Sequence, residues 1–200
     1  MTIERPVLMS GPMVRALLAG RKSQTRRLPT PQWRAIAAGD VLWVRETWYP
    51  RPDPPGGAMF RADWKPPGTG IMAALTAGPM TVPWKSPLFM PRAMARILLQ
   101  VTEVRIEPLQ AITEADAKAE GVEPERDEHG VPIVIPPGDK PSPIEYVERS
   151  GNAMQDIRAA LAYRPHYAAF WDTLHQKTGT KWHDNPEVAV VCFKPFEKAR

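Results

Sequence analysis

A lysine and a threonine three positions apart are the residues of this 200-residue chain whose types and spacing point most directly to chemistry. Lys22 and Thr25 belong to the segment GRKSQTRR at residues 20–27. A lysine can activate a neighbouring hydroxyl as a nucleophile when burial or nearby cations lower the pKa of the lysine. On an extended strand the two side chains face opposite sides, so a bend before the strand is needed to bring them into one pocket. Without that bend the segment is a solvated basic strand end.

Glu120 is a candidate partner for Lys22. It lies near the end of the segment TEADAKAEG at residues 113–121, where Thr113 is placed as the cap and Asp116 stands where a capping box has glutamate. The pattern predicts a helix that stops at the glycine. A carboxylate in the last helical turn meets the unfavourable end of the helix dipole. Glu120 therefore becomes a catalytic candidate if it faces Lys22, and is otherwise an ordinary surface glutamate.

Glu46 and Trp48 belong to a third segment, WVRETW at residues 43–48. A carboxylate on a mostly apolar strand needs a partner or an opening to solvent. Glu46 could pair with Arg26 or Arg45, or act as a general base. Trp48 could stack on a nucleobase, although packing in the core is the commoner role of such a tryptophan.

His183 and Asp184 could also do acid–base chemistry, but their segment WHDNP at residues 182–186 is typical of a turn before a strand. Cys192 lies in an apolar run and is expected to be a buried structural thiol. The four histidines and one cysteine show no paired spacing typical of zinc ligands. We therefore expect no metal and no cofactor.

The elements that position these residues follow from hydrophobic periodicity and turn residues. Strands are predicted at 6–10, 41–49, 93–106 and 187–196, with 23–27 extended, and helices from Gly11 to Gly20, over 113–120 and over 167–177. Strands and helices do not alternate regularly, so a doubly wound parallel sheet is disfavoured. The pattern favours an α+β fold, namely a small mixed β-barrel, partly closed, with peripheral helices.

Proline is the unusual feature of the composition, with 24 residues in 200. Ten of them lie in residues 50–91 and six in 124–143. Proline inside a helix costs about 3 kcal/mol, which excludes a helical bundle. The 43% hydrophobic content and seven tryptophans exclude a wholly disordered chain. The chain is therefore predicted to be a single domain over 1–200 with stiff insertions at about 50–91 and 122–156.

The charge is unevenly distributed. The net charge is +4, yet residues 111–156 hold eleven acidic and four basic side chains. The rest of the chain is correspondingly more basic, which suits a polyanionic partner and equally an ordinary mildly basic protein. No apolar run approaches the 18 residues of a membrane span, and the N-terminus lacks a signal-peptide pattern. We expect a cytoplasmic protein without a membrane partner.

Taken together, the segments 8–27, 39–48, 96–121 and 182–193 resemble the ASCH domain, a branch of the PUA-like superfamily, and in particular the ASCH-like proteins of phages and prophages. The most specific part is a Gly-x-Lys-x-x-Thr-x-Arg pattern, formed here by Gly20, Lys22, Thr25 and Arg27 and followed by Gly-Asp and a strand. The matching segments cover about half of the chain. The two proline-rich stretches fall in the gaps between them.

The resemblance implies a PUA-like barrel with a cleft between the first helix and the sheet. It also implies recognition of RNA, DNA or modified nucleosides. One branch of the family hydrolyses the acyl amide of N4-acetylcytidine with a lysine, a threonine and a glutamate, which match Lys22, Thr25 and Glu120. In that mechanism Lys22 activates Thr25, Glu120 holds Lys22 and relays a proton, and Arg26 or a main-chain N–H stabilises the oxyanion. The expected substrate-binding residues are Arg21, Arg26, Arg27, Arg45, Glu46 and Trp48.

Two other functions remain open at this stage. The same cleft could grip RNA or DNA without turnover, with its arginines as phosphate contacts, or it could belong to a ribonuclease, an activity of another branch that depends on the same lysine position. In a further alternative, a phage-type accessory protein, the insertions dock an unknown protein partner. The chain departs from the small amidohydrolases in its length, its two insertions, the pair Arg26-Arg27 and the segment 45–48.

Overall fold

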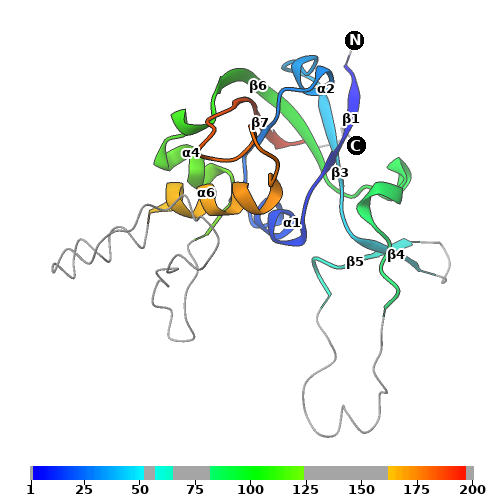
Figure 1. The fold of residues 1–200 in the computed structure, drawn as a ribbon. Helices are drawn as coiled ribbons and strands as arrows, with labels where there is room; N and C mark the ends of the chain where they lie inside the picture. The colour runs from blue at the N-terminus through cyan, green and yellow to red at the C-terminus, as the bar shows by residue number, and fades with distance from the viewer. Residues whose placement is uncertain (1, 52–56, 65–81, 124–161, 197–200) are drawn as a thin grey trace, which may run out of the picture.

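The computed structural model describes residues 2–51, 57–64, 82–123 and 162–196, and its main feature is a five-stranded mixed sheet (Figure 1). The strands are ordered β1-β3-β6-β7-β2. Their bounds are Glu4–Leu8 (β1), Gln24–Arg27 (β2), Val41–Arg45 (β3), Leu98–Pro108 (β6) and Glu187–Pro195 (β7). The β1–β3 pair is parallel and the other three pairs are antiparallel. The α+β class is thereby confirmed. Among the described strands the sheet does not close, because β1 pairs with β3 alone and β2 with β7 alone.

The middle of the sheet supplies the core. The first four residues of β3 are buried, as expected for a strand with apolar residues on both faces. In β7, the four residues Val188–Val191 are fully buried. β6 and β7 pair along most of their length, with one register shift between Val101 and Glu103. The strands β1 and β2 therefore form the two edges of a sheet whose middle is buried.

Helices cover the ends of this sheet. They are α1 (Gly11–Leu18), α2 (Pro31–Arg34), α4 (Glu114–Ala119) and α6 (Tyr163–Leu174). The predicted capping box of α4 is present, since Thr113 and Asp116 bond reciprocally. The last helix begins before residue 167 and ends before residue 177, so its predicted bounds are wrong at both ends. In Figure 1, α4 and α6 lie on one side of the molecule.

The prediction of one continuous strand over 41–49 is wrong. The chain leaves the main sheet after β3, and β4 (Trp48–Arg51) pairs instead with β5 (Gly57–Phe60) as a separate two-stranded ribbon. At the break, the main-chain N–H of Glu46 lies 3.3 Å from Sδ of Met90 rather than on a neighbouring strand. The ribbon lies at the opposite side of the molecule from α4 and α6 (Figure 1).

Of the two predicted insertions, the first is partly described by the structure. The first, over 50–91, contains β5 and the 3₁₀ turn η1 (Pro87–Phe89) within its described parts. The strand predicted at 93–106 starts later than expected, because residues Arg92–Met94 form a second 3₁₀ turn, η2. The second insertion, over 122–156, lies almost wholly outside the described residues. No helix in the described ranges is long and apolar enough to cross a bilayer.

Candidate functional site

A cavity of about 360 Å³ lies between the two outer strands of the sheet. The end of β1 and the chain after it line one side, β2 lines another, and side chains of α6 complete the wall. The residues that face this cavity are Leu8, Met9, Ser10, Met13, Lys22, Thr25, Arg26, Arg27, Ser86, Pro87, Leu88, Glu120, Tyr167, Phe170, Trp171, Leu174 and His175. Lys22, Thr25 and Glu120 are therefore brought together at one cavity.

Lys22 and Glu120 form a buried ion pair at this cavity. Lys22 is 5% exposed and Glu120 is 3% exposed. Nζ of Lys22 donates to Oε2 of Glu120 at 3.0 Å and to the main-chain oxygen of Glu120 at 2.8 Å. Burial lowers the pKa of Lys22, although the neighbouring carboxylate acts in the opposite direction. The lysine is thus closer to its neutral form than a solvated lysine at the same pH.

The bend that brings Lys22 and Thr25 together lies at the end of α1. Gly20 has φ of +69°, and the main-chain N–H groups of Arg21 and Lys22 both donate to the carbonyl of Ala16. These bonds reverse the chain before β2 begins, so the side chain of Lys22 does not follow the alternation of the strand. The predicted bend is confirmed in these residues.

A second glycine allows α4 to approach this bend. Gly121 has φ of +80°, and a Cβ built on it would lie 2.8 Å from Cβ of Ala16 and 2.8 Å from Cβ of Lys22. The main-chain N–H of Ser23 also donates to the carbonyl of Ala119 at 2.9 Å. Only glycine fits this backbone conformation and this spacing, so Gly121 sets the distance between Glu120 and Lys22.

Thr25 lies in β2 opposite Val191 and is 3% exposed. It faces the same cavity as Lys22. Its hydroxyl makes no hydrogen bond within the described part of the chain and is not among the fully buried polar atoms that lack a partner. The hydroxyl is therefore available to a molecule that enters the cavity.

Arg26 is tied into a network of carboxylates. Its side chain is fully buried, and its Nη1 donates to Oε1 of Glu120 at 3.2 Å while its Nη2 donates to Glu107 at 2.8 Å. Asp116 lies 3.5 Å from the same Nη2. Arg105 extends the network, because it bonds both Glu107 and Asp116. Arg26 thus shares the charge of Glu120 with Lys22 and leaves neither Nη group without a protein partner.

Arg27 links the two edges of the sheet. Its Nη2 donates to the carbonyl of Leu8 at 2.7 Å, and its guanidinium lies 5.6 Å from the ring centre of Trp33. It also lines the cavity. Burial lowers the pKa of Arg27, while Glu120 acts to raise it. Arg27 therefore adds positive charge beside Thr25 and Glu120.

The remaining predicted substrate-binding residues do not line this cavity. Arg21 is half exposed and pairs with Glu123. Arg45 donates to the carbonyl of Met90 and lies 4.8 Å from the ring centre of Trp43. These contacts explain why the two arginines point elsewhere.

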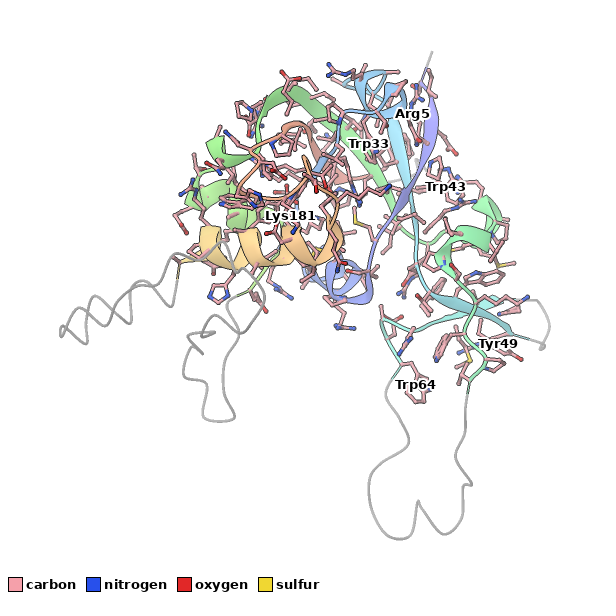
Figure 2. All side chains as sticks on the ribbon, viewed as in Figure 1. Arg5, Trp33, Trp43, Tyr49, Trp64 and Lys181 are labelled. Atoms are coloured by element: carbon pink, nitrogen blue, oxygen red, sulfur yellow. The ribbon has the colours of Figure 1, made fainter. Side chains whose placement is uncertain are left out.

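Glu46 and Trp48 belong to the region near the ribbon. Glu46 is 1% exposed, and both of its oxygens accept from Arg96, at 2.8 and 3.0 Å. Of the two roles that the sequence left open for Glu46, an ion pair is found, but its partner is Arg96 and not Arg26 or Arg45, because the chain turns away at the end of β3. Trp48 is buried beneath Lys85, whose Nζ lies 5.6 Å from the ring centre. Figure 2 shows Tyr49 of β4 and Trp64, which follows β5, on this side of the molecule.

The other candidate residues, His183, Asp184 and Cys192, lie outside the cavity. Asp184 accepts from the main-chain N–H of Lys181 in the predicted turn, and the exposed ring of His183 lies 3.2 Å from the same carboxylate. Cys192 is partly buried beside Arg105 and Gln24. The described residues hold no group of three or more His, Cys, Asp or Glu side chains that could bind a metal ion.

Sequence reasoning missed the wall that α6 contributes. Tyr167, Trp171 and His175 all face the cavity. His175 stacks on Trp171 with ring centres 3.8 Å apart, and burial lowers its pKa. The sequence indicates the apolar face of this helix but carries no signal for what that face covers, because α6 is far in sequence from Lys22 and Thr25.

Comparisons with known proteins do not extend this picture. No family model matches the chain. No curated protein matches it, and no solved structure does.

Proposed function

We propose that this protein is an ASCH-type domain that recognises a modified nucleoside and hydrolyses an N-acyl amide on its nucleobase, as in N4-acetylcytidine. The observation that carries the proposal is the meeting of Lys22, Thr25 and Glu120 at one cavity, with Nζ of Lys22 on Oε2 of Glu120 at 3.0 Å. The three residues come from α1–β2 and from the end of α4, nearly 100 positions apart. They are the residue types that acyl transfer by a threonine nucleophile requires.

The sheet supports the corresponding fold proposal, a PUA-like barrel that is open along one seam. The outer strands β1 and β2 both contribute to the cavity, and Arg27 of β2 donates to the carbonyl of Leu8 in β1. The cavity therefore lies where a closing sheet would bring its two edges together. Side chains of α6 line the cavity between these two edges. We propose that the barrel closes there around a bound ligand.

The mechanism begins with a proton transfer from Thr25. Neutral Lys22 accepts the hydroxyl proton as Oγ1 of Thr25 attacks the amide carbonyl. The tetrahedral intermediate then expels the nucleobase amine, which takes a proton from the Lys22–Glu120 pair. Water hydrolyses the acyl-threonine in a second step, which releases the carboxylic acid and restores the hydroxyl.

Burial and charge around Lys22 fit this role. A protonated lysine cannot accept the proton of Thr25, so the lowered pKa of Lys22 raises the reactive fraction. Arg26 supports the same state, because its ion pair with Glu120 draws part of the carboxylate's charge away from Lys22. The cavity volume lies near the lower end of the roughly 300–1,000 Å³ typical of small-molecule sites, which suits one nucleoside better than an oligonucleotide.

The test is hydrolysis of N4-acetylcytidine by the purified protein, followed by chromatography of cytidine. We expect cytidine release by the wild type and a loss of at least about 100-fold in kcat for Lys22→Ala and for Thr25→Val. The surface variant Arg21→Ala, which alters a half-exposed residue outside the cavity, should retain full activity. Absence of cytidine release, or undiminished release by Lys22→Ala, refutes the proposed hydrolysis.

A second candidate function is binding without turnover. The observation that favours it is the completeness of the Lys22–Glu120 pair, in which the ammonium has two acceptors of the same residue. Such a pair can serve simply as the polar floor of a nucleoside site. Binding of N4-acetylcytidine measured by calorimetry, with no cytidine formed over a long incubation, would support this function over hydrolysis.

A further inference from the structure

The oxyanion of the proposed intermediate needs a hydrogen-bond donor, and the arginines nearest to Thr25 are already engaged. Both Nη groups of Arg26 bond carboxylates, and Nη2 of Arg27 bonds the carbonyl of Leu8. The Nε atom of each arginine has no partner among the described residues, but it is fully buried and therefore out of reach of a molecule in the cavity. The sequence-based expectation that Arg26 stabilises the oxyanion is therefore not favoured by its contacts. The oxyanion therefore needs a donor from an element other than β2.

Tyr167 is such a donor. It lies in α6, is 2% exposed and faces the cavity. Its ring is held in place by Phe170 and Trp171, with ring centres 6.4 and 6.3 Å away. A large aromatic side chain packed in this way keeps its hydroxyl at a fixed position in the cavity wall.

The hydroxyl of Tyr167 has no other task that the described residues show. It makes no hydrogen bond in the described part of the chain. Because it is not among the fully buried polar atoms that lack a partner, its oxygen is accessible from the cavity. A buried tyrosine normally places its hydroxyl on a partner. Tyr167 lines the same cavity as Thr25, Glu120, Arg26 and Arg27. The charges of Glu120, Arg26 and Arg27 act on its hydroxyl.

We propose that Tyr167 is a further catalytic residue, whose hydroxyl donates a hydrogen bond to the carbonyl oxygen of the scissile amide and to the oxyanion formed from it. This inference rests on the proposed amide hydrolysis. Burial, reinforced by Glu120, raises the pKa of Tyr167 well above that of a free tyrosine, so the hydroxyl keeps its proton at neutral pH. A neutral donor in a water-poor cavity stabilises developing negative charge without losing its own proton.

Tyr167 donates a hydrogen bond in each step but transfers no proton. As the bond from Oγ1 of Thr25 to the carbonyl carbon forms, the π electrons of the C=O bond move onto oxygen, and the Thr25 proton moves to Lys22. Tyr167 donates to that oxygen throughout. When the C–N bond breaks, the electrons return to reform C=O, and the amine leaves with the proton from Lys22. Tyr167 begins and ends protonated.

The experiment compares Tyr167→Phe with Tyr163→Phe in the full chain, using N4-acetylcytidine as substrate. Tyr163 belongs to the same helix, lies 5.8 Å from Nζ of Lys118 and does not face the cavity. We expect Tyr167→Phe to lower kcat by about 100- to 1,000-fold with KM changed less than threefold, the effect typical of losing one oxyanion donor. We expect Tyr163→Phe to retain wild-type kcat. Near-ultraviolet circular dichroism and thermal melting serve to compare the folded state of each variant.

Each outcome decides the question. Wild-type activity that persists within threefold in Tyr167→Phe overturns the role of Tyr167 and leaves the hydrolase proposal standing. A loss of kcat accompanied by a lower melting temperature and an equally raised KM shows a packing role and also overturns it. If the wild type itself releases no cytidine while Lys22→Ala behaves identically, the hydrolase proposal fails, and the oxyanion role fails with it.

Discussion

Lys22 donates to two oxygens of one residue, the carboxylate Oε2 and the main-chain oxygen of Glu120, at 3.0 and 2.8 Å. The carboxylate and the main chain at the end of α4 therefore hold the same ammonium group. The carbonyl is at the C-terminal end of a helix, where the partial negative charge favours a cation. This arrangement explains how Glu120 can occupy an electrostatically poor position in its own helix, since the charge of Lys22 offsets the repulsion.

The first prediction concerns Gly121. Gly121→Ala forces a Cβ to within 2.8 Å of both Ala16 and Lys22, in a backbone conformation that alanine adopts poorly. The matched control is Gly179→Ala, because Gly179 has nearly the same φ, +82°, and a Cβ added there would meet nothing within 4 Å. We expect chemical denaturation to show a loss of about 1 kcal/mol for Gly179→Ala and about 2 kcal/mol more for Gly121→Ala.

The two glycine variants should also differ in their rate of hydrolysis. Gly121→Ala moves Glu120 away from Lys22, so hydrolysis of N4-acetylcytidine should fall at least tenfold under conditions where the protein is still folded. Gly179→Ala should hydrolyse at the wild-type rate. Equal stability of the two variants would contradict the close approach of α4 to the end of α1.

Local rules predicted much of the fold. The capping pattern at Thr113 and Asp116 predicted the start of α4, and glycine at 20 predicted the end of α1. The two-sided apolar pattern predicted the central position of β3. These features depend on residues close together in the sequence, so periodicity and turn chemistry are enough to find them.

The pairing of distant segments could not be predicted in the same way. The choice of Arg96 as the partner of Glu46 depends on where the chain turns away from the main sheet, and the sequence carries no measure of that turn. Likewise, Tyr167 and Thr25 line the same cavity although they lie far apart in the sequence. The residue types and spacing of Lys22 and Thr25 indicated possible chemistry but also fit a solvated strand end, and the resemblance to the ASCH domain linked them with Glu120 as one catalytic set.

The second prediction concerns the Glu46–Arg96 pair. Arg96→Met leaves the almost fully buried Glu46 without its guanidinium, and we expect a loss of about 2 kcal/mol at pH 7. This is less than the ~3–5 kcal/mol of a fully buried pair, because the side chain of Arg96 is 27% exposed. The double variant Glu46→Leu/Arg96→Met should recover most of the loss in urea denaturation.

The pH dependence of this loss has a definite sign. Burial raises the pKa of Glu46 in the folded protein above its ordinary value of 4.5. The folded state therefore holds more protons than the unfolded state between the two values, and its stability falls as pH rises through the folded pKa. Arg96→Met raises that pKa further, so its deficit should be larger at pH 7 than at pH 4.5. A deficit that does not change with pH would contradict burial of a charged Glu46.

The third prediction concerns the cap of α4. Thr113→Ala removes the hydroxyl that bonds the main chain and side chain of Asp116, and we expect a loss of about 1 kcal/mol. Thr30→Ala is the matched control, since Thr30 also precedes a helix but makes no side-chain capping bond. It should cost only a few tenths of a kcal/mol.

The cap also has a pH signature. Burial acts to raise the pKa of Asp116, but the hydrogen bonds from Thr113 and the nearby arginines lower it below its ordinary value of 3.8. The resulting stability is present above 3.8 and is lost as pH falls through the lowered folded pKa. The difference between wild type and Thr113→Ala in urea denaturation should therefore shrink below pH 3.8. A constant difference would mean that the hydroxyl bonds only the main chain.

The fourth prediction uses the charges around Lys22. Because the neutral lysine is the base, kcat/KM for N4-acetylcytidine should rise with pH until it passes the lowered pKa of Lys22. Glu120 raises this pKa, so Glu120→Gln should move the rising limb to lower pH while it reduces the plateau about 100-fold or more through loss of proton relay. Arg27 lowers the same pKa, so Arg27→Met should move the limb to higher pH.

The measurement is a profile of kcat/KM from pH 5 to 10 for the wild type, Glu120→Gln and Arg27→Met. Shifts in opposite directions show that the titrating group lies close to both Glu120 and Arg27, as Lys22 does. Limbs that coincide in all three proteins would assign the proton transfer to another residue and remove Lys22 from the chemical step.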